Sequence, residues 1–470
     1  MKNIFKISAV LFLVISLVVS SCKKEEVLID GCTDSSAMNY LPDAANYGAE
    51  IFCEVWVSHV EKAEGGWLVH FQPVGKGREK FAAPTLFVRA ELVVISAGTL
   101  GSTEILLRSR KKGLQMSDQL GKHFTGNGDI LGFGYNNAPV INGIGFGAKA
   151  PGKLAPVGPC ITSIIDMRYG DSWRERMVIE EGTMPGALGK VLPGAMAAAA
   201  ATMGADTDNN FMDNIKGKLR EWDSLMRGPY HGAINHTQTY LIMSHDNGAG
   251  EMTLEADRLR VNWPGVGEQI NFIKGNENLY KATKALGGDY VENPLWTPLF
   301  KKSLITVHPL GGCVTGADAE QGVTNHKGQV FSGVKGTTVY AGLYVSDGAI
   351  IPTSVAVNPL LTISAMTERC CALIAEDRGW HINYELPSKP RVVPEQPQLG
   401  IEFTETMKGY FSSDFELSEL SESYQIAADH GKASDSSMEF TLTISSDNLN
   451  TLIDSPEHDA RIIGTLNASA

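Results

Sequence analysis

Positive charge is scarce in this sequence of 470 residues. Its 40 lysine and arginine residues stand against 53 aspartates and glutamates, which gives a formal net charge of −13 at pH 7. A protein that binds nucleic acid or a membrane surface through its charge has the opposite balance. We therefore expect no nucleic-acid partner and no basic membrane-binding patch.

Cysteine is also scarce, and none of the seven cysteines belongs to a CxxC pair. His308 and Cys313 are close in sequence, but two residues are too few ligands for a zinc site. We therefore predict no metal centre. The vicinal Cys370 and Cys371 fall in a helical pattern, where small buried side chains are a better interpretation than a redox pair.

Hydrophobic runs long enough to span a bilayer are missing. The N-terminal run Ile7–Val19 is too short, and with Lys2 and Lys6 before it the pattern is typical of a secretory leader. Small residues before Cys22 resemble a bacterial lipobox, although an ordinary signal peptide or a short buried helix remains the alternative. We expect an exported protein anchored to a membrane only through a lipidated Cys22, followed by a tether in which Cys32 and Cys53 pair.

Glycine, in contrast, is abundant. The chain has 49 glycines, where average usage would give roughly 33. In the segment TVHPLGGCVTG (residues 306–316), the proline after His308 favours an extended backbone. Gly311 and Gly312 then allow the backbone to approach something flat or bulky. The pattern favours packing against a large ligand.

Two stretches read as strands of an α/β sheet. Residues 91–98 (ELVVISAG) read as a buried strand followed by a helix that opens near Gly101, whose amides would face a cofactor ribose or phosphate. Residues 337–348 read as a strand that ends in Asp347 and Gly348, where open α/β sheets bind ligands. Plain α/β packing is the alternative for the first stretch.

Other patterns predict a hairpin, two further strands and a long helix. Alternating residues on either side of the Gly65-Gly66 turn indicate a hairpin, and TYLIMSHD and MTLEADRLRVNW indicate antiparallel strands. The helix spans residues 358–380, with Asn358 as its N-cap and Pro359 in its first turn. A Pro-rich linker and a polar, strand-prone tail follow it.

Five stretches together resemble the GMC family of FAD-dependent alcohol oxidoreductases, most of all its cholesterol oxidase branch. The resemblance runs from about Met38 to Trp380. The stretches are SAGTLGSTEILLRS, SDQLGKHFTGNGD, HPLGGC, NHKGQVF and VSDGAIIPTSVAVNPLLTISAMTER.

The resemblance implies FAD as cofactor and assigns roles to individual residues. His308, which on its own would be read as a structural histidine, would deprotonate or orient the substrate hydroxyl. Asn358 would assist it, besides capping its helix. Glu180, with Glu181 as its rival and a surface acid as the alternative, would move the proton that shifts a Δ5 double bond to Δ4. The residues expected along the cofactor are Gly98, Thr99, Gly101, Asn127, Gly311, Asp347, Gly348 and Asn358.

The strand–GxGxxG–helix unit of this family is not found. GIGFGA at residues 143–148 has no buried strand before it, and Pro151 and Pro156 preclude a long helix after it. Because that unit normally holds the pyrophosphate, we expect the chain to be the C-terminal half or more of an oxidoreductase behind a lipoprotein leader. We also expect poor FAD binding and an exposed sheet edge.

The expected fold is α/β plus antiparallel β: an incomplete FAD-binding domain with an inserted β-sheet substrate-binding domain. The expected segments are a signal peptide (1–22), a tether and Cys-bracketed segment (23–53), a partial FAD domain (54–149), a substrate domain (150–305), the C-terminal part of the FAD domain (306–380) and a tail (381–470).

The expected activity is oxidation of a secondary alcohol, a 3-hydroxysteroid by resemblance, with oxygen or another electron acceptor. The alternative is a catalytically dead fragment or an exported binding module.

Overall fold

The computed structural model describes residues 40–74, 85–145, 161, 163–169, 172–207, 211–384, 400–412, 423–446, 448–449 and 460–469. Contacts divide the chain into two units, residues 1–31 with 52–385 and residues 32–51 with 386–470. The expected leader and Cys32 lie outside the described residues, so the lipid anchor and the disulfide stay predictions. Cys53 is exposed and is a free cysteine.

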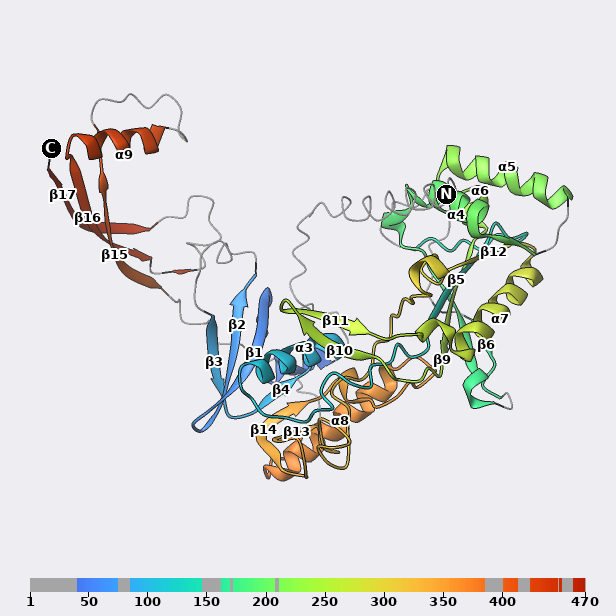
Figure 1. The fold of residues 1–470 in the computed structure, drawn as a ribbon, viewed down its shortest axis with the longest axis horizontal. Helices are drawn as coiled ribbons and strands as arrows, with labels where there is room; N and C mark the ends of the chain where they lie inside the picture. Colours follow the sequence, from blue (N-terminus) through green and yellow to red (C-terminus); the bar gives the residue numbers. More distant parts are fainter. Residues whose placement is uncertain are drawn as a thin grey trace. The chain divides into compact units, whose positions relative to one another are not determined.

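The first unit opens with an antiparallel meander of β1 (Val55–Ala63), β2 (Gly66–Pro73) and β3 (Leu86–Ala90) (Figure 1). The predicted hairpin is confirmed, since β1 pairs with β2; its turn residues are Glu64 and Gly65, and Gly66 is already paired with Ala63. Val60 and Trp67 bury one face of the meander in the core.

Both predicted strands are present, and the structure pairs them with each other. β4 (Val93–Ile95) runs parallel to β14 (Val339–Val345), with β13 (Gln329–Phe331) on the far side of β14, although β4 and β14 are more than 240 residues apart (Figure 1). Helix α3 (Gly98–Lys111) follows β4, and the short 3-10 helix η6 (Gly348–Ile350) follows β14. Both connections therefore leave the carboxyl ends of neighbouring strands.

β4 is not fully buried, contrary to expectation, because it is the outer strand of this sheet among the described residues. Val94 is 39 % exposed. An open hollow of about 570 Å³ lies beside it, lined by β1, β4 and one side of α3, including Ile105 and Arg108. The hollow and the outer position of β4 agree with the exposed sheet edge expected from the sequence.

Helix α8 (Leu360–Asp377) confirms the predicted long helix but begins two residues later than expected. Pro359 stands at its N-cap position, and no side chain caps the helix. The predicted cap by Asn358 is therefore wrong, and the side chain of Asn358 is used elsewhere. Of the two vicinal cysteines only Cys370 is buried, whereas Cys371 on the next position of the helix is exposed.

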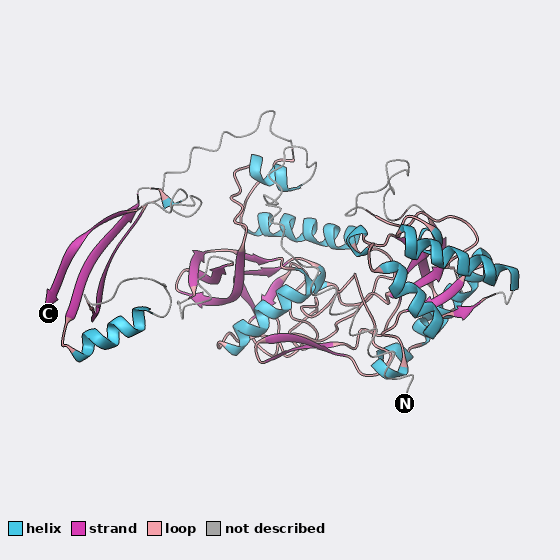
Figure 2. Ribbon diagram, turned by 90° about the horizontal axis from the view of Figure 1, so that it is seen from above, coloured by secondary structure: helices cyan, strands magenta, loops and turns pink. Residues whose placement is uncertain are grey.

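The second layer of the unit is an antiparallel six-stranded sheet in the order β6-β7-β9-β5-β12-β8 (Figure 2). Its strands are β5 (Ile130–Tyr135), β6 (Ile164–Asp166), β7 (Met177–Gly182), β8 (Ala205–Asp206), β9 (Gln238–Ser244) and β12 (Asp289–Glu292). Because β5 sits in the interior of the sheet, the expected domain boundary at residue 150 falls after the first strand of the sheet instead of before it.

Helices cover both faces of this sheet. They are α4 (Leu192–Met203), α5 (Phe211–Arg227), α6 (Gly232–Asn235) and α7 (Ile270–Leu286). Alternate residues of one strand face opposite sides: Tyr290 packs in the core with Leu279 of α7, whereas Val291 packs in another core with Met196 of α4. The sheet is therefore a rigid support for side chains at its ends.

The hairpin of β10 (Glu251–Glu255) and β11 (Arg258–Asn262) does not join the six-stranded sheet. It packs on α3, where Nε of Arg108 donates to Asp257 at 3.2 Å. The expected substrate segment thus contributes a hairpin to the first layer.

The second unit contains helix α2 (Tyr40–Asn46) and a tail of β15 (Ile401–Tyr410), α9 (Ser423–Ala433), β16 (Ser437–Ser446) and β17 (Arg461–Ser469). The three strands form an antiparallel sheet in sequence order, as the strand-prone composition predicted. Among the described residues, no helix combines the length and the apolar character needed to cross a bilayer.

Candidate active site

The side chain of His308 is held by a buried carboxylate. Asp129, which directly precedes β5, is 2 % exposed. Its Oδ1 lies 3.0 Å from Nδ1 of His308, and its Oδ2 accepts from the backbone amides of Val307 and His308 and from the hydroxyl of Thr306. This contact fits the tautomer that has its proton on Nδ1 and leaves Nε2 as the reactive nitrogen.

Two opposing effects set the pKa of His308. Burial lowers it, but the hydrogen bond and charge of Asp129, the charge of Glu180 and a hydrogen bond to Asn358 raise it, and the net pKa lies above its ordinary value. Only about 15 % of the imidazole is exposed, so these contacts are little screened. The group can therefore take up a proton readily.

The structure brings three of the predicted residues together: His308, Asn358 and Glu180. Nδ2 of Asn358 donates to Oε1 of Glu180 at 2.6 Å. The Asn358 side chain also lies near enough to His308 to contribute to the raised pKa of the imidazole. The three residues come from separate elements: Glu180 from β7, His308 from the loop between η5 (Pro298–Phe300) and β13, and Asn358 from the turn before α8. An imidazole, an amide and a carboxyl group thus form one polar cluster.

Glu180 is better placed than its rival Glu181. Neighbouring residues on a strand face opposite sides of the sheet. Of the two, Glu180 accepts the hydrogen bond from Asn358 and is buried, with only 5 % of its surface exposed. Its second oxygen, Oε2, has no partner among the described residues. Burial raises the pKa of Glu180, although the hydrogen bond from Asn358 opposes the shift.

Asn127 fixes the segment that carries Asn358. Its Oδ1 accepts from the amides of Val355 and Ala356 at 2.9 and 3.0 Å, and its Nδ2 donates to the carbonyl of Val357 at 2.9 Å. Asn127 and Ala356 both have positive φ, 55° and 54°. These three hydrogen bonds position the segment before Asn358, whereas the predicted contact of Asn127 with the cofactor stays untested.

A second buried carboxylate, Asp246, holds the loop that contains Asn127. Its Oδ2 accepts from the hydroxyl of Thr125 and from the amides of Gly126 and Gly128, and its Oδ1 accepts from the amide of Gly248. Burial raises its pKa, and these four hydrogen bonds oppose the shift. The loop is thereby fixed on both sides of Asn127.

The predicted cofactor residues at the start of α3 lie beside the His308 loop. The hydroxyl of Thr99 donates to the carbonyl of Pro309 at 2.6 Å. Gly98 has φ of 74°, is exposed, and has no atom within 4 Å of the place where a Cβ would stand. Gly101 is required inside the helix, since a Cβ there would lie 2.9 Å from Cβ of Ala97.

Asp347 and Gly348 connect the ends of the parallel strands. Asp347 accepts hydrogen bonds from the hydroxyl of Ser102 and from the amide of Ala349. A Cβ on Gly348 would lie 2.8 Å from Oγ1 of Thr99. These two predicted residues thus join η6 to the start of α3.

The two glycines of HPLGG, Gly311 and Gly312, are needed for close contacts within the chain itself. A Cβ on Gly311 would lie 2.0 Å from the carbonyl oxygen of His123, and one on Gly312 would lie 2.2 Å from Cε of Met252. Both have φ near 90°. The backbone therefore approaches other parts of the chain itself, and the interpretation that these glycines make room for a ligand is not needed.

Sequence reasoning missed Asp129 and Asp246. Asp129 ends the quoted stretch TGNGD and precedes a strand, so a carboxylate beside a predicted site was visible in the sequence. Asp246 stands at the end of the predicted strand TYLIMSHD and had no neighbour in sequence to mark it. Only the fold, which joins residues more than 100 positions apart, shows what either carboxylate holds.

An apolar hollow of about 280 Å³ lies beside β7. It is lined by Glu180 and Glu181, by Ile164 and Ile165 of β6, and by residues of α7. It is slightly smaller than the usual range for small-molecule sites, about 300–1,000 Å³.

Residues 271–367, which include His308 and Asn358, match the family model described as GMC oxidoreductase. This match and the relatives below support the GMC family as the class of protein to which the chain is related.

The relatives named cholesterol oxidase include one from Mycobacterium tuberculosis (strain H37Rv), 27 % identical over 395 residues, which cover 78 % of this chain and 61 % of that protein. A cholesterol oxidase from Acinetobacter baumannii is 25 % identical over 367 residues, 72 % of this chain and 57 % of its own length. The chain thus matches about 60 % of the length of these relatives. A pyridoxine 4-oxidase from Mesorbium loti has a TM-score of 0.40 at 16 % identity, covering 70 % of this chain and 58 % of that one.

Proposed function

We propose that the chain derives from an FAD-dependent oxidoreductase that oxidises a secondary alcohol, with a 3-hydroxysteroid as substrate. The observation that carries this proposal is the polar cluster of His308, Asn358 and Glu180, in which Asp129 hydrogen-bonds the His308 ring. The steroid comes only from the two relatives named cholesterol oxidase, since the hollow beside β7 is small for a sterol.

The residues present fit a flavin in part. The carboxyl ends of β4 and β14 form the position at which open α/β sheets bind ligands. Gly98 is exposed there with open space at its Cα, and α3 begins without a side-chain cap or an acidic residue in its first turn. Gly98, Thr99, Asp347 and Gly348 would hold the cofactor. When bound, the flavin supplies the acceptor for hydride.

The chain's own residues handle the protons. Nε2 of His308 would accept the proton of the substrate hydroxyl, while Asp129 holds Nδ1 and stabilises the imidazolium that forms. Asn358, through its amide, would orient the hydroxyl toward His308. Glu180, buried and with one free oxygen, would carry a proton between two carbons in the Δ5-to-Δ4 step.

The first prediction concerns the cofactor. We expect the purified chain to lack stoichiometric flavin absorbance and to bind added FAD weakly, because no GxGxxG unit holds the pyrophosphate. Each tenfold loss of affinity corresponds to about 1.4 kcal/mol. Quenching of flavin fluorescence during an FAD titration measures the affinity. A purified protein that carries one flavin per chain would contradict the prediction.

Activity is then tested with FAD in excess. Cholesterol should produce the 3-ketosteroid, together with peroxide if oxygen is the acceptor; turnover with an artificial acceptor alone would identify another electron carrier. Absence of steroid oxidation at an FAD concentration shown to saturate the chain would overturn the proposed function.

The second prediction concerns pH. Because the pKa of His308 is raised and the base must be neutral, kcat/KM should fall as the pH drops through a value above the ordinary one of about 6.5. Asp129→Asn removes the charge that raises this pKa, so the acidic limb should move to lower pH and kcat should decrease.

Asp129 also accepts from backbone amides, so the variant can lose stability. An NMR titration of the His308 ring in the wild-type protein is therefore the independent check. A titration midpoint of the His308 ring at or below about 6.5 would contradict the conclusion that its pKa is raised.

A further inference from the structure

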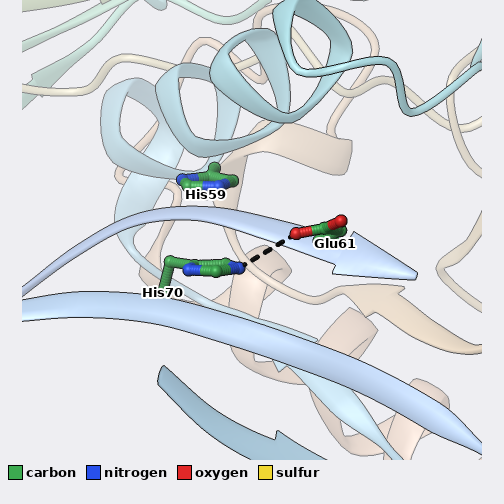
Figure 3. A group of neighbouring side chains, drawn as sticks. All are labelled: His59, Glu61 and His70. Carbon is green, nitrogen blue, oxygen red and sulfur yellow. Dashed lines mark hydrogen bonds and ion pairs between the residues drawn. The ribbon is translucent and has the colours of Figure 1, made fainter. Parts of the chain in front are cut away.

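A cluster of three metal-ligand side chains lies outside the candidate active site, on the meander of β1, β2 and β3. His59 and Glu61 are two residues apart on β1 and so share one face. His70 on β2 is the direct partner of His59 in the antiparallel register. Strand pairing alone therefore brings two imidazoles and one carboxylate together (Figure 3).

The ligand atoms are already close. One atom of each of His59, Glu61 and His70 lies within 4.8 Å of the others. Nε2 of His70 is 3.2 Å from Oε2 of Glu61, and the two imidazole rings are stacked with their centroids 4.2 Å apart (Figure 3). Glu61 is 58 % exposed, so an ion can reach the cluster from solvent.

The surroundings of His59 suit a ligand. Its Nδ1 lies 2.7 Å from the hydroxyl oxygen of Ser58, which is buried. If that hydroxyl accepts the Nδ1 proton, Nε2 keeps its lone pair, and such a partner is the usual support of a metal-binding histidine.

We propose that His59, Glu61 and His70 bind a zinc-class divalent cation, with a water molecule as the fourth ligand. Tetrahedral zinc with ligand distances of about 2.0–2.1 Å separates its ligand atoms by roughly 3.3 Å. The 3.2 Å gap between His70 and Glu61 fits this separation. Two imidazoles and one carboxylate suit zinc, nickel or copper, whereas magnesium and calcium prefer oxygen ligands.

Binding requires one movement. A metal lies in the plane of each imidazole that binds it, and the rings of His59 and His70 are nearly parallel, at 4°. One ring must therefore tilt, and the stack is lost. The positive charges of Arg108 and Lys112 also act on His59, and they oppose the binding of a cation there. Both costs point to micromolar affinity.

The test uses the full chain, freed of metal with a chelator and titrated with zinc chloride by calorimetry. We expect one zinc per chain, and a loss of affinity of at least about tenfold in His59→Ala and in His70→Ala. His381→Ala, which removes an exposed histidine outside the cluster, is the matched control and should bind like the wild type.

Cobalt and NMR give readouts that do not depend on the variants folding. Bound cobalt should show the absorption of a tetrahedral site, and zinc should shift the ring resonances of His59 and His70 in the wild type. The proposal is overturned if the wild type binds no zinc, if both variants bind as well as it does, or if zinc leaves these two rings unchanged.

Discussion

Replacing His308 with asparagine is expected to lower kcat/KM by about 10²–10⁴-fold, the range typical of general acid–base catalysis. The asparagine keeps a polar side chain near Asp129 but has no group that can accept a proton near neutral pH. Steroid oxidation with saturating FAD measures the effect. Because His308 joins Asp129 to Asn358, no other single side chain of the cluster should matter as much.

Two controls separate catalysis from binding and folding. His326→Ala removes an exposed histidine of the same layer and should leave kcat/KM unchanged. The affinity of His308→Asn for FAD, measured by fluorescence quenching, should match that of the wild type. A variant that oxidises steroid at the wild-type rate, or that loses activity only through weaker FAD binding, would make His308 a structural residue.

Local patterns in the sequence were enough for most of the fold. The Gly65-Gly66 pair and the alternation on either side of it predicted the hairpin of β1 and β2. The apolar run ending at Gly98 and the strand-like run ending at Asp347 predicted β4 and β14 singly, whereas their parallel pairing came only from the structure. These predictions succeeded because each depends on neighbours in sequence, where turn chemistry and periodicity act.

The sheet insertion was harder to delimit. The short turn Gly126–Gly128 is the only break before β5, which begins directly after Asp129, and it does not differ from a turn within one domain. The exposure of β4 likewise depends on its position at the outside of its sheet. Strand order is a property of the whole fold, and no local pattern encodes it.

The candidate site likewise combines residues that the sequence indicated with contacts that only the fold reveals. The resemblance suggested His308, Asn358 and Glu180, and the structure brings these side chains together, while their roles stay predictions. Asp129 and the Asn127 amide hold these residues in place through hydrogen bonds between positions more than 170 residues apart in the sequence. The sequence prediction of no metal considered only the absence of CxxC and the pair His308 and Cys313. The cluster of His59, Glu61 and His70 was not visible to it, because these residues meet only through strand register.

Gly311 offers the largest expected effect on stability. Gly311→Ala should destabilise the chain by at least about 3 kcal/mol, because an added Cβ would meet the carbonyl oxygen of His123 at 2.0 Å and the residue has φ of 87°. The carbonyl oxygen of His123 belongs to the backbone, so it cannot move away as the end of a flexible side chain could. Urea denaturation followed by circular dichroism measures the loss.

Gly336→Ala is the matched control, since Gly336 has φ of 80° and no atom within 4 Å of the Cβ position. It should cost only the penalty of left-handed backbone, about 1–2 kcal/mol. The difference between the two variants measures the clash between the His308 loop and the loop of His123. If both variants lose the same stability without FAD, this close approach does not exist in solution, and the ligand interpretation of the HPLGG glycines returns.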